Sequence, residues 1–214
     1  MKKCDANLRQ QILDAALKVF AERGYAGASI HDIVERTTGS KPSLYYYFES
    51  KEALYKALVD YALDECYALT QKAAARSQVL EEQFVEILQA QFEFLKEHRD
   101  LVRLAFSAAF ASPGELPEGV AVSERGRRNF EFFHALIQAG LASGQLDKSF
   151  DSLTLAHGIY GALCFHLMVA TIGHEITLDR QVAEQIVRLY FQGAREMTPQ
   201  CCLSTATVQQ EAVK

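Results

Sequence analysis

The stretch Ser29-Ile-His-Asp-Ile-Val-Glu-Arg-Thr-Thr-Gly-Ser-Lys-Pro-Ser-Leu-Tyr-Tyr-Tyr-Phe48 decides the fold. Ser29 and Asp32 have the three-residue spacing of a capping box, which marks the N-terminus of a helix. Gly39 then interrupts the helical pattern and suits a turn that needs a positive φ angle. A second helical segment follows at once. The order of helix, tight turn and helix predicts a helix-turn-helix motif.

The second helix of this motif has one buried side and several exposed faces. Ser40 is placed to cap it, and Pro42 falls in its first turn, where a missing N–H group costs nothing. Leu44 and Phe48, four residues apart, form its buried side. Its other faces carry Lys41, Ser43, Tyr45, Tyr46 and Tyr47.

Three consecutive tyrosines on a short helix cannot all be buried, because successive helical residues point about 100° apart. Tyrosine hydroxyls and lysine ammonium groups are suited to phosphate oxygens, so these faces favour contact with nucleic acid. Ser50 predicts the cap of the next helix, with Lys51 at its first position. The free N–H groups of that helix N-terminus form a further phosphate-binding site. The alternative is an ordinary helical hairpin with surface tyrosines.

Helical periodicity continues through the rest of the chain, and clean strand alternation is nearly absent. Gly24 is a candidate C-cap for the first helix. The pattern predicts an all-α fold of about nine helices over residues 7–23, 29–37, 41–47, 51–74, 78–97, 99–111, 121–143, 149–172 and 179–196. The most apolar window, 156–172, contains two histidines and is expected to be a buried helix rather than a membrane span.

Net charge at first argues against a nucleic-acid partner, because the whole chain carries a formal charge of −5. Residues 1–56 hold nine Lys or Arg and seven Asp or Glu, which gives this segment +2. Subtracting +2 from −5 leaves −7 for the remainder. A mildly basic head on an acidic body agrees with DNA binding by two paired heads.

Five cysteines, at positions 4, 66, 164, 201 and 202, show no Cys-x-x-Cys spacing and indicate a reducing, cytoplasmic location. A secretory signal is not expected. No phosphate loop, nucleophile elbow or zinc-protease motif is seen, so an enzyme, a cofactor and a metal site are not predicted. Redox sensing through Cys201 and Cys202 remains an alternative.

The N-terminal block Leu8–Tyr61 resembles the DNA-binding domain of the TetR (tetracycline-repressor-like) family of bacterial transcription regulators. The residues that carry the resemblance are Ile12–Ala16, Phe20–Tyr25, Ser29–Ile33 and Ser40–Leu54. The resemblance implies that the start of the recognition helix reads base edges and that flanking residues contact phosphates. Base contacts would come from Lys41, Pro42, Ser43 and Tyr45, and phosphate contacts from Ser29, Thr38, Ser40, Tyr46, Tyr47 and Lys51.

Two positions depart from the common pattern of the family. Many relatives have a small residue in place of Pro42 and histidine in place of Tyr47. Because Pro42 has no N–H group to donate, its expected role is apolar contact with a thymine methyl.

In TetR-like proteins the last two long helices pair with those of a second copy, which implies a homodimer on a near-palindromic operator. The predicted interface residues are Ile159, Tyr160, Leu163, Val182, Ile186, Leu189 and Tyr190. The alternative is that these stripes pack only inside the monomer.

The middle of the chain is rich in phenylalanine, and the resemblance implies a ligand cavity in this part of the body. Candidate lining residues are Phe92, Phe106, Phe110, Phe133, His134, Cys164, Phe165, His166 and Met168. The alternative is that they are core residues. The expected ligand is an apolar or aromatic small molecule.

The predicted protein is a ligand-responsive DNA-binding regulator, a repressor that a small effector releases from its operator. The predicted parts are a helix-turn-helix domain over 1–55, a ligand-binding and dimerisation domain over 56–197, and a polar tail over 198–214. A redox-responsive regulator and a non-enzymatic activator are the alternatives.

Overall fold

The computed structural model describes residues 2–112, 114–116, 120, 124–173 and 176–194. These residues form nine helices and include no strand, which confirms the all-α class. The helices are α1 (Lys2–Gly27), α2 (Ile30–Val34), α3 (Lys41–Tyr47), α4 (Lys51–Ala74), α5 (Leu80–Glu97), α6 (Arg99–Ala109), α7 (Glu124–Ser143), α8 (Ser152–Thr171) and α9 (Arg180–Ala194). The predicted tail, 198–214, lies outside the described residues.

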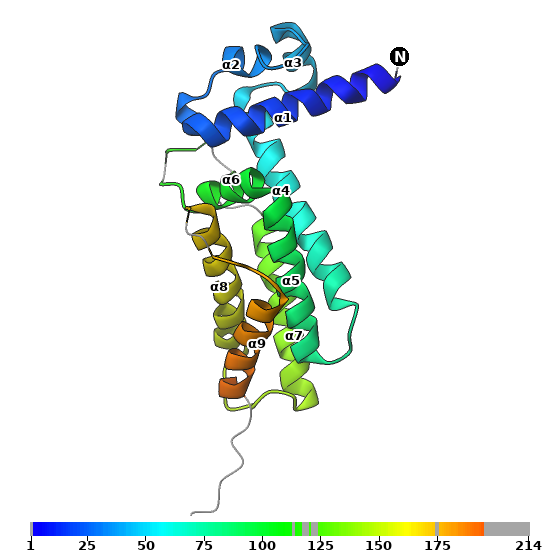
Figure 1. Ribbon diagram of the computed structural model, residues 1–214, viewed down its shortest axis with the longest axis vertical. Coiled ribbons are helices and arrows are strands. Elements are labelled where there is room, and N and C mark those ends of the chain that lie inside the picture. The colour runs from blue at the N-terminus through cyan, green and yellow to red at the C-terminus, as the bar shows by residue number, and fades with distance from the viewer. Residues whose placement is uncertain (1, 113, 117–119, 121–123, 174–175, 195–214) are drawn as a thin grey trace, which may run out of the picture.

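The molecule is elongated, with a small head at one end of a helical body (Figure 1). The helices α1, α2 and α3 form the head, and α1 lies across the beginning of α4. From there α4 continues into the body, where α5, α7, α8 and α9 follow the same long axis. The short α6 lies crosswise between the head and the long helices. Only α4 therefore belongs to both parts.

Helix boundaries agree with the predicted ones to within three residues, except for α1, which was predicted over 7–23 and extends over Lys2–Gly27. The predicted ranges 41–47 and 51–74 are reproduced by α3 and α4, because each begins directly after a serine cap. Gly24 has a φ angle of 69° and a ψ angle of 177° inside α1, so it interrupts the helix as predicted. A short helical segment then continues to Gly27 before α2 begins.

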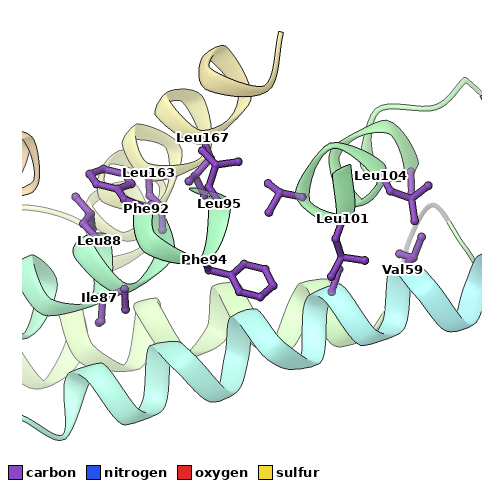
Figure 2. Close-up of a cluster of buried hydrophobic side chains, with 14 of the residues drawn as sticks. Val59, Ile87, Leu88, Phe92, Phe94, Leu95, Leu101, Leu104, Leu163 and Leu167 are labelled. Atoms are coloured by element: carbon purple, nitrogen blue, oxygen red, sulfur yellow. The ribbon is translucent and has the colours of Figure 1, made fainter. Parts of the chain in front are cut away.

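The body has a core built by amphipathic helices that face one another. Figure 2 shows Phe92 and Leu95 of α5 extending toward Leu163 and Leu167 of α8, and all four side chains are buried. On α5 the buried positions recur every three or four residues, which is the period of one helix face. The buried residues of α5 are Leu80, Phe84, Val85, Ile87, Leu88, Ala90, Gln91, Phe92, Phe94 and Leu95, and among them Leu80, Phe84, Ile87, Gln91 and Leu95 follow this period.

Two arginines of α6 join parts of the fold that are distant in sequence. The Arg103 guanidinium donates a hydrogen bond to the carbonyl oxygen of Ala21, at 2.7 Å, and so ties α6 to α1 in the head. The Arg99 guanidinium donates to the carbonyl oxygen of Ala170, at 3.0 Å, near the end of α8. Cations placed at helix C-termini interact favourably with the carbonyls that lack helical partners there.

Ion pairs join α4 to the first turns of α7. Arg125 contacts the carboxylate of Asp60 at 2.9 Å and that of Asp64 at 3.0 Å. Arg128 contacts Asp64 at 2.8 Å and lies over the ring of Tyr67, 4.0 Å from its centroid. These contacts fix the beginning of α7 against the helix that continues into the head.

The apolar helix α8 is less buried than its sequence predicts. Among the described residues, α8 is the one helix that is both long enough and apolar enough to cross a membrane, with a mean hydropathy of 1.5. Only 28% of that window is buried inside the protomer. Leu153, Phe165 and Ile172 are exposed. The prediction of a buried helix over 156–172 therefore holds for the face of α8 that includes Ile159, Leu163 and Leu167, and is wrong for the opposite face, against which none of the described helices packs.

Candidate DNA-binding surface and ligand cavity

The helix-turn-helix of the head is held by two capping boxes. The Ser29 hydroxyl accepts a hydrogen bond from the Asp32 N–H group at 3.2 Å, and the Asp32 carboxylate accepts one from the Ser29 N–H group at 3.1 Å. Ser40 caps α3 in the same way, with Ser43 as its reciprocal partner. These caps confirm the predicted starts of α2 and α3 and set the tight turn between them.

Ion pairs tie α2 to α1. Arg36 contacts the carboxylate of Glu22 at 2.7 Å, and Arg23 contacts that of Asp32 at 2.9 Å. The hydrogen bond from Arg36 holds the pKa of Glu22 below its ordinary value. The Ser29 hydroxyl, and then Arg23, lower the pKa of Asp32. These carboxylates are therefore charged at neutral pH and bind the motif to the rest of the head.

Gly39 is favoured by close packing against α1 and not by its backbone angles. The positive-φ glycines among the described residues are Gly24, Gly114, Gly144 and Gly173, so the prediction of a positive φ angle at Gly39 is wrong. A Cβ atom on Gly39 would lie 2.9 Å from Cδ1 of Leu8. The turn passes directly over α1, and a glycine leaves room for that approach.

The recognition helix α3 presents a polar and aromatic surface. Leu44 is fully buried and Phe48 nearly so, which confirms the predicted buried side. Tyr46 is 80% exposed and Tyr45 is 43% exposed, so these two tyrosines face solvent. Lys41, Pro42 and Ser40 are exposed at the beginning of the helix. The predicted base-reading residues and the exposed tyrosines thus share one accessible surface.

Other predicted phosphate-contacting residues have partners inside the head. The Lys51 ammonium donates to the carbonyl oxygens of Tyr25 and Ala28, at 2.9 and 3.0 Å. It also lies 4.4 Å from the centroid of the Tyr25 ring. The Thr38 hydroxyl donates to the side chain of Gln11 at 2.8 Å. Lys51 therefore has a structural role at the end of α1, and its phosphate contact stays a prediction.

The body encloses a cavity of about 540 Å³, within the usual range for small-molecule sites. Its wall comes from α4, α5, α6, α7 and α8, and nearly all of it is apolar. The polar lining residues of the inner wall are Cys66, Thr70, Gln91, Asn129, Tyr160 and Cys164. The helices α4 and α6 both line the cavity and both contact α1, so these two helices connect the cavity wall to the head.

Comparison with known proteins agrees with this geometry. Residues 12–58 match the family described as "Bacterial regulatory proteins, tetR family". This head belongs to the TetR family. The matched segment begins within α1 and ends within α4, so it covers the whole helix-turn-helix and the start of the connecting helix.

The curated relatives of this chain named below are transcriptional regulators. It is 30% identical over 115 residues to the HTH-type transcriptional activator FasR of Mycolicibacterium smegmatis, which covers 54% of this chain and 52% of FasR. It is 25% identical over 146 residues to the HTH-type transcriptional repressor KstR2 of the same species, covering 68% of this chain and 71% of KstR2. The chain spans about half the length of the first two curated relatives that it matches, 56% and 52%.

The TetR-family fold extends through the body. The crystal structure of FadR from Bacillus subtilis in complex with stearoyl-CoA has a TM-score of 0.75 to this chain. It is 16% identical and covers 87% of this chain and 100% of the FadR chain. The likeness shows that head and body together adopt the architecture of a bacterial regulator, and none of the proteins named here is described as an enzyme.

Four of the nine predicted ligand residues line the cavity of this TetR-family protein: Phe106, Phe110, Phe133 and Cys164. Phe92 is fully buried between α5 and α8 (Figure 2) and is not among the lining residues. Phe165 is 60% exposed. His134 and His166 bond to Ser152 and to the Ala162 carbonyl, and Met168 is absent from the lining. The sequence pattern identified the apolar helices but not which face of each meets the cavity.

The lining residues that the sequence pattern missed include the polar groups of the inner wall as well as small and aliphatic side chains. Gln91 and Asn129 are buried inside amphipathic helices, and Cys66 and Thr70 lie on the connecting helix α4. A buried polar residue at a core position is a signal in the sequence, because such residues need partners. Gln91 and Asn129 stand at such positions in their helices, among apolar neighbours.

The residues predicted for dimerisation divide between the core and the surface. Ile159 and Leu163 are buried inside the protomer, so their side chains are not available to a second copy. Tyr190 donates a hydrogen bond to the Leu155 carbonyl within the same chain. Leu189 is 77% exposed. The apolar face left open on α8 and α9 therefore includes Leu189 of the predicted set but not Ile159 or Leu163, which pack inside the same chain.

Within the described residues, no group of three or more His, Cys, Asp or Glu side chains is placed to hold a metal ion. Cys66 and Cys164, the two thiols for which burial is described, both lie in the cavity wall. Burial raises the pKa of Cys66 to about 12 and that of Cys164 to about 11. Both are protonated at neutral pH, whereas the nucleophilic form of cysteine is the thiolate.

Proposed function

We propose that this protein is a ligand-responsive DNA-binding regulator, a repressor that leaves its operator when a small apolar or aromatic effector binds. The observation that carries the proposal is the presence, in one chain, of an exposed TetR-family recognition helix and an apolar cavity joined by α4. KstR2 is described as a repressor, and the FadR structure is that of a regulator in complex with stearoyl-CoA. Together they support a repressor with an effector of lipophilic character.

The proposed division places DNA binding in residues 1–55 and effector binding and dimerisation in 56–197, with a polar tail over 198–214. Support comes from the position of α4, which is packed against α1 in the head and lines the cavity farther along. A cytoplasmic location follows from a function on DNA.

In the head, the proposed base contacts come from Lys41, Pro42, Ser43 and Tyr45 at the beginning of α3. Side chains that enter the major groove at the start of a recognition helix read base edges. Tyr46 is exposed on the same helix and is suited to a phosphate oxygen. The exposed ammonium of Lys41 adds charge neutralisation, which makes affinity depend on salt.

We propose a homodimer formed through the open apolar face of α8 and α9. Leu153, Phe165 and Leu189 are exposed there. A Cβ atom added at Gly161 or Gly193 would meet nothing within 4 Å, so both glycines leave space for a second copy. A two-fold axis through this face would place two heads on one duplex, which suits a near-palindromic operator.

Effector control would act through the spacing of the two heads. A ligand that binds more tightly to one conformation of the body shifts the population toward it. The helix α6 lines the cavity, and its Arg103 holds the Ala21 carbonyl of the head. Displacement of α6 by a ligand would therefore move α1 and α4 and change the distance between the recognition helices.

The redox alternative has less support. Cys66 and Cys164 are protonated thiols in an apolar wall, and Cys201 and Cys202 lie outside the described residues. The activator alternative has the support of FasR, whose name describes an activator. Repressor and activator differ in where the operator lies relative to the promoter.

The test is a footprint of the full-length protein on the DNA flanking its own gene. We expect a protected near-palindrome with two half-sites about one helical turn apart. Tyr46→Ala should abolish protection, and Gln138→Ala, an exposed change on α7, should leave it intact. Protection that survives Tyr46→Ala together with Lys41→Ala would refute the assignment of the head.

A further inference from the structure

The cavity wall contains one buried hydrogen-bond acceptor without a partner. Asn129 lines the cavity, is only 8% exposed, and its Oδ1 atom has no hydrogen-bond partner. Its Nδ2 atom donates to the carbonyl oxygen of Leu63 on α4, at 3.1 Å. That hydrogen bond fixes the orientation of the amide, because a reversed amide would place two oxygens against each other. An unpaired buried acceptor is costly, which makes it a natural point for a ligand donor.

The other amide and hydroxyl donors of the inner wall are used within the protein. The Thr70 hydroxyl donates to the Cys66 carbonyl at 2.8 Å. The Gln91 amide donates to that carbonyl and to the Thr70 oxygen, at 2.8 and 2.9 Å. A ligand that can only accept hydrogen bonds therefore finds these donors occupied, whereas a ligand that donates would satisfy the buried Asn129 oxygen once the side chains over it make room.

The inner wall also carries no ionised group. Desolvation raises the pKa of the Cys66 and Cys164 thiols, and it also raises the pKa of the Tyr160 hydroxyl, so all three are neutral at pH 7. Arg127 is the charged lining residue of the described part of the chain. Its side chain is 62% exposed and paired with Glu131 and Glu124. An ion inside the cavity would lose its hydration without gaining a counter-charge.

We propose that the cavity takes an uncharged, lipophilic ligand with one hydrogen-bond donor, a hydroxyl or an N–H group, that binds the Oδ1 atom of Asn129. The apolar wall supplies affinity through burial of the ligand surface, and Asn129 supplies selectivity. This inference rests on the proposed function, because it names the class of effector. It also connects the ligand to α4, since the same amide holds the Leu63 carbonyl.

Three aromatic probes of nearly the same shape test the proposal. N-phenylnaphthylamine is neutral and has one N–H donor. Its N-methyl derivative lacks the donor, and anilinonaphthalene sulfonate has the donor and an added negative charge. Dissociation constants are measured by calorimetry on the full-length protein. We expect the neutral donor to bind about 10-fold more tightly than the N-methyl derivative, and the sulfonate to bind more weakly still.

The variant Asn129→Leu removes the acceptor and keeps a similar volume. We expect the ratio of the two neutral probes to fall from about 10 to about 1, since only the hydrogen bond distinguishes them. Gln138→Leu, which changes an exposed amide on the same helix, should keep the wild-type ratio. Because the readout is a ratio, any general loosening of the cavity affects both probes equally.

The proposal is overturned if the two neutral probes bind wild type equally, if the sulfonate binds as tightly, if none binds, or if Asn129→Leu keeps the ratio. The wild-type measurements alone decide the matter if Asn129→Leu does not fold. Release of DNA is measured separately with the same probes. If the two neutral probes show the expected ratio but neither releases DNA, the ligand site stands. The proposed function, in which a ligand controls DNA binding, is then refuted.

Discussion

Replacing the exposed apolar side chains of α8 and α9 by charge should convert the dimer to a monomer without unfolding the protomer. The double variant Phe165→Glu with Leu189→Glu changes side chains that are 60% and 77% exposed in one protomer. Because they contribute little to the core, the protomer should keep its helical content and its melting behaviour. In the proposed dimer the same side chains are buried against a second copy.

The magnitude follows from the exposed fractions. Full burial of such a side chain is worth about 1.5–3 kcal/mol, and the exposed part of each makes up roughly 1–2 kcal/mol of that. A two-fold interface contains each residue twice, so four side chains contribute about 4–8 kcal/mol as an upper estimate. Because 4–8 kcal/mol is an upper estimate, we take half of it as the loss in the double variant. A loss of about 2–4 kcal/mol raises the dissociation constant of the dimer roughly 30- to 1,000-fold.

Sedimentation velocity over a concentration series measures the effect directly. Wild type should sediment as a dimer at micromolar concentration and the double variant as a monomer. Tyr61→Glu is the matched control, since Tyr61 is 50% exposed and lies on α4, outside α8 and α9. A double variant that remains dimeric, or a wild type that is monomeric throughout, would show that the open face of α8 and α9 is not the interface.

Three further outcomes are expected. Lys41→Gln should reduce the slope of log affinity against log salt by about 0.9, as the loss of one neutralising charge requires, and Tyr46→Phe should weaken binding at every salt concentration without changing that slope; filter binding at several salt concentrations would contradict this if the slope of Lys41→Gln stays at the wild-type value or if Tyr46→Phe binds as tightly as wild type. Gly39→Ala should lower the free energy of unfolding by about 1–3 kcal/mol in urea titrations, because its Cβ would lie 2.9 Å from Leu8, and unchanged stability would show that the turn moves freely. The pKa of Asp32 is lowered in the folded head, so its stabilisation is present at neutral pH and lost as the pH falls through the folded pKa; thermal melts of Asp32→Asn and wild type should therefore differ at pH 7 and converge in acid, and a constant difference would be evidence against this role.

Much of the head was predictable because its determinants are local. Ser29 and Ser40 cap α2 and α3 with hydroxyls that reach N–H groups only three residues away. Leu44 and Phe48 are buried because they share one helix face. Caps and helix periodicity depend on neighbouring residues in the chain, so they are visible without a tertiary structure.

The cavity and the dimer face were predicted less well, because they depend on how helices rotate against one another. Phe92 and Phe106 look alike in sequence, yet Phe92 is buried between α5 and α8 and Phe106 lines the cavity. Ile159 and Phe165 both belong to an apolar helix, and only Phe165 remains exposed. Apolar residues on several sides of α8 gave no indication of which side a neighbour would cover.

By itself, the sequence determined an all-α chain with a capped helix-turn-helix and an apolar, phenylalanine-rich body. Only the tertiary structure decided that Lys51 holds the end of α1, that Gly39 makes room for Leu8, and that the Asn129 oxygen is left unpaired in a cavity. The physical reason is the distance along the chain over which each kind of interaction acts. Capping and periodicity act over a few residues, whereas partners for buried polar atoms come from helices that are distant in sequence and meet only on folding.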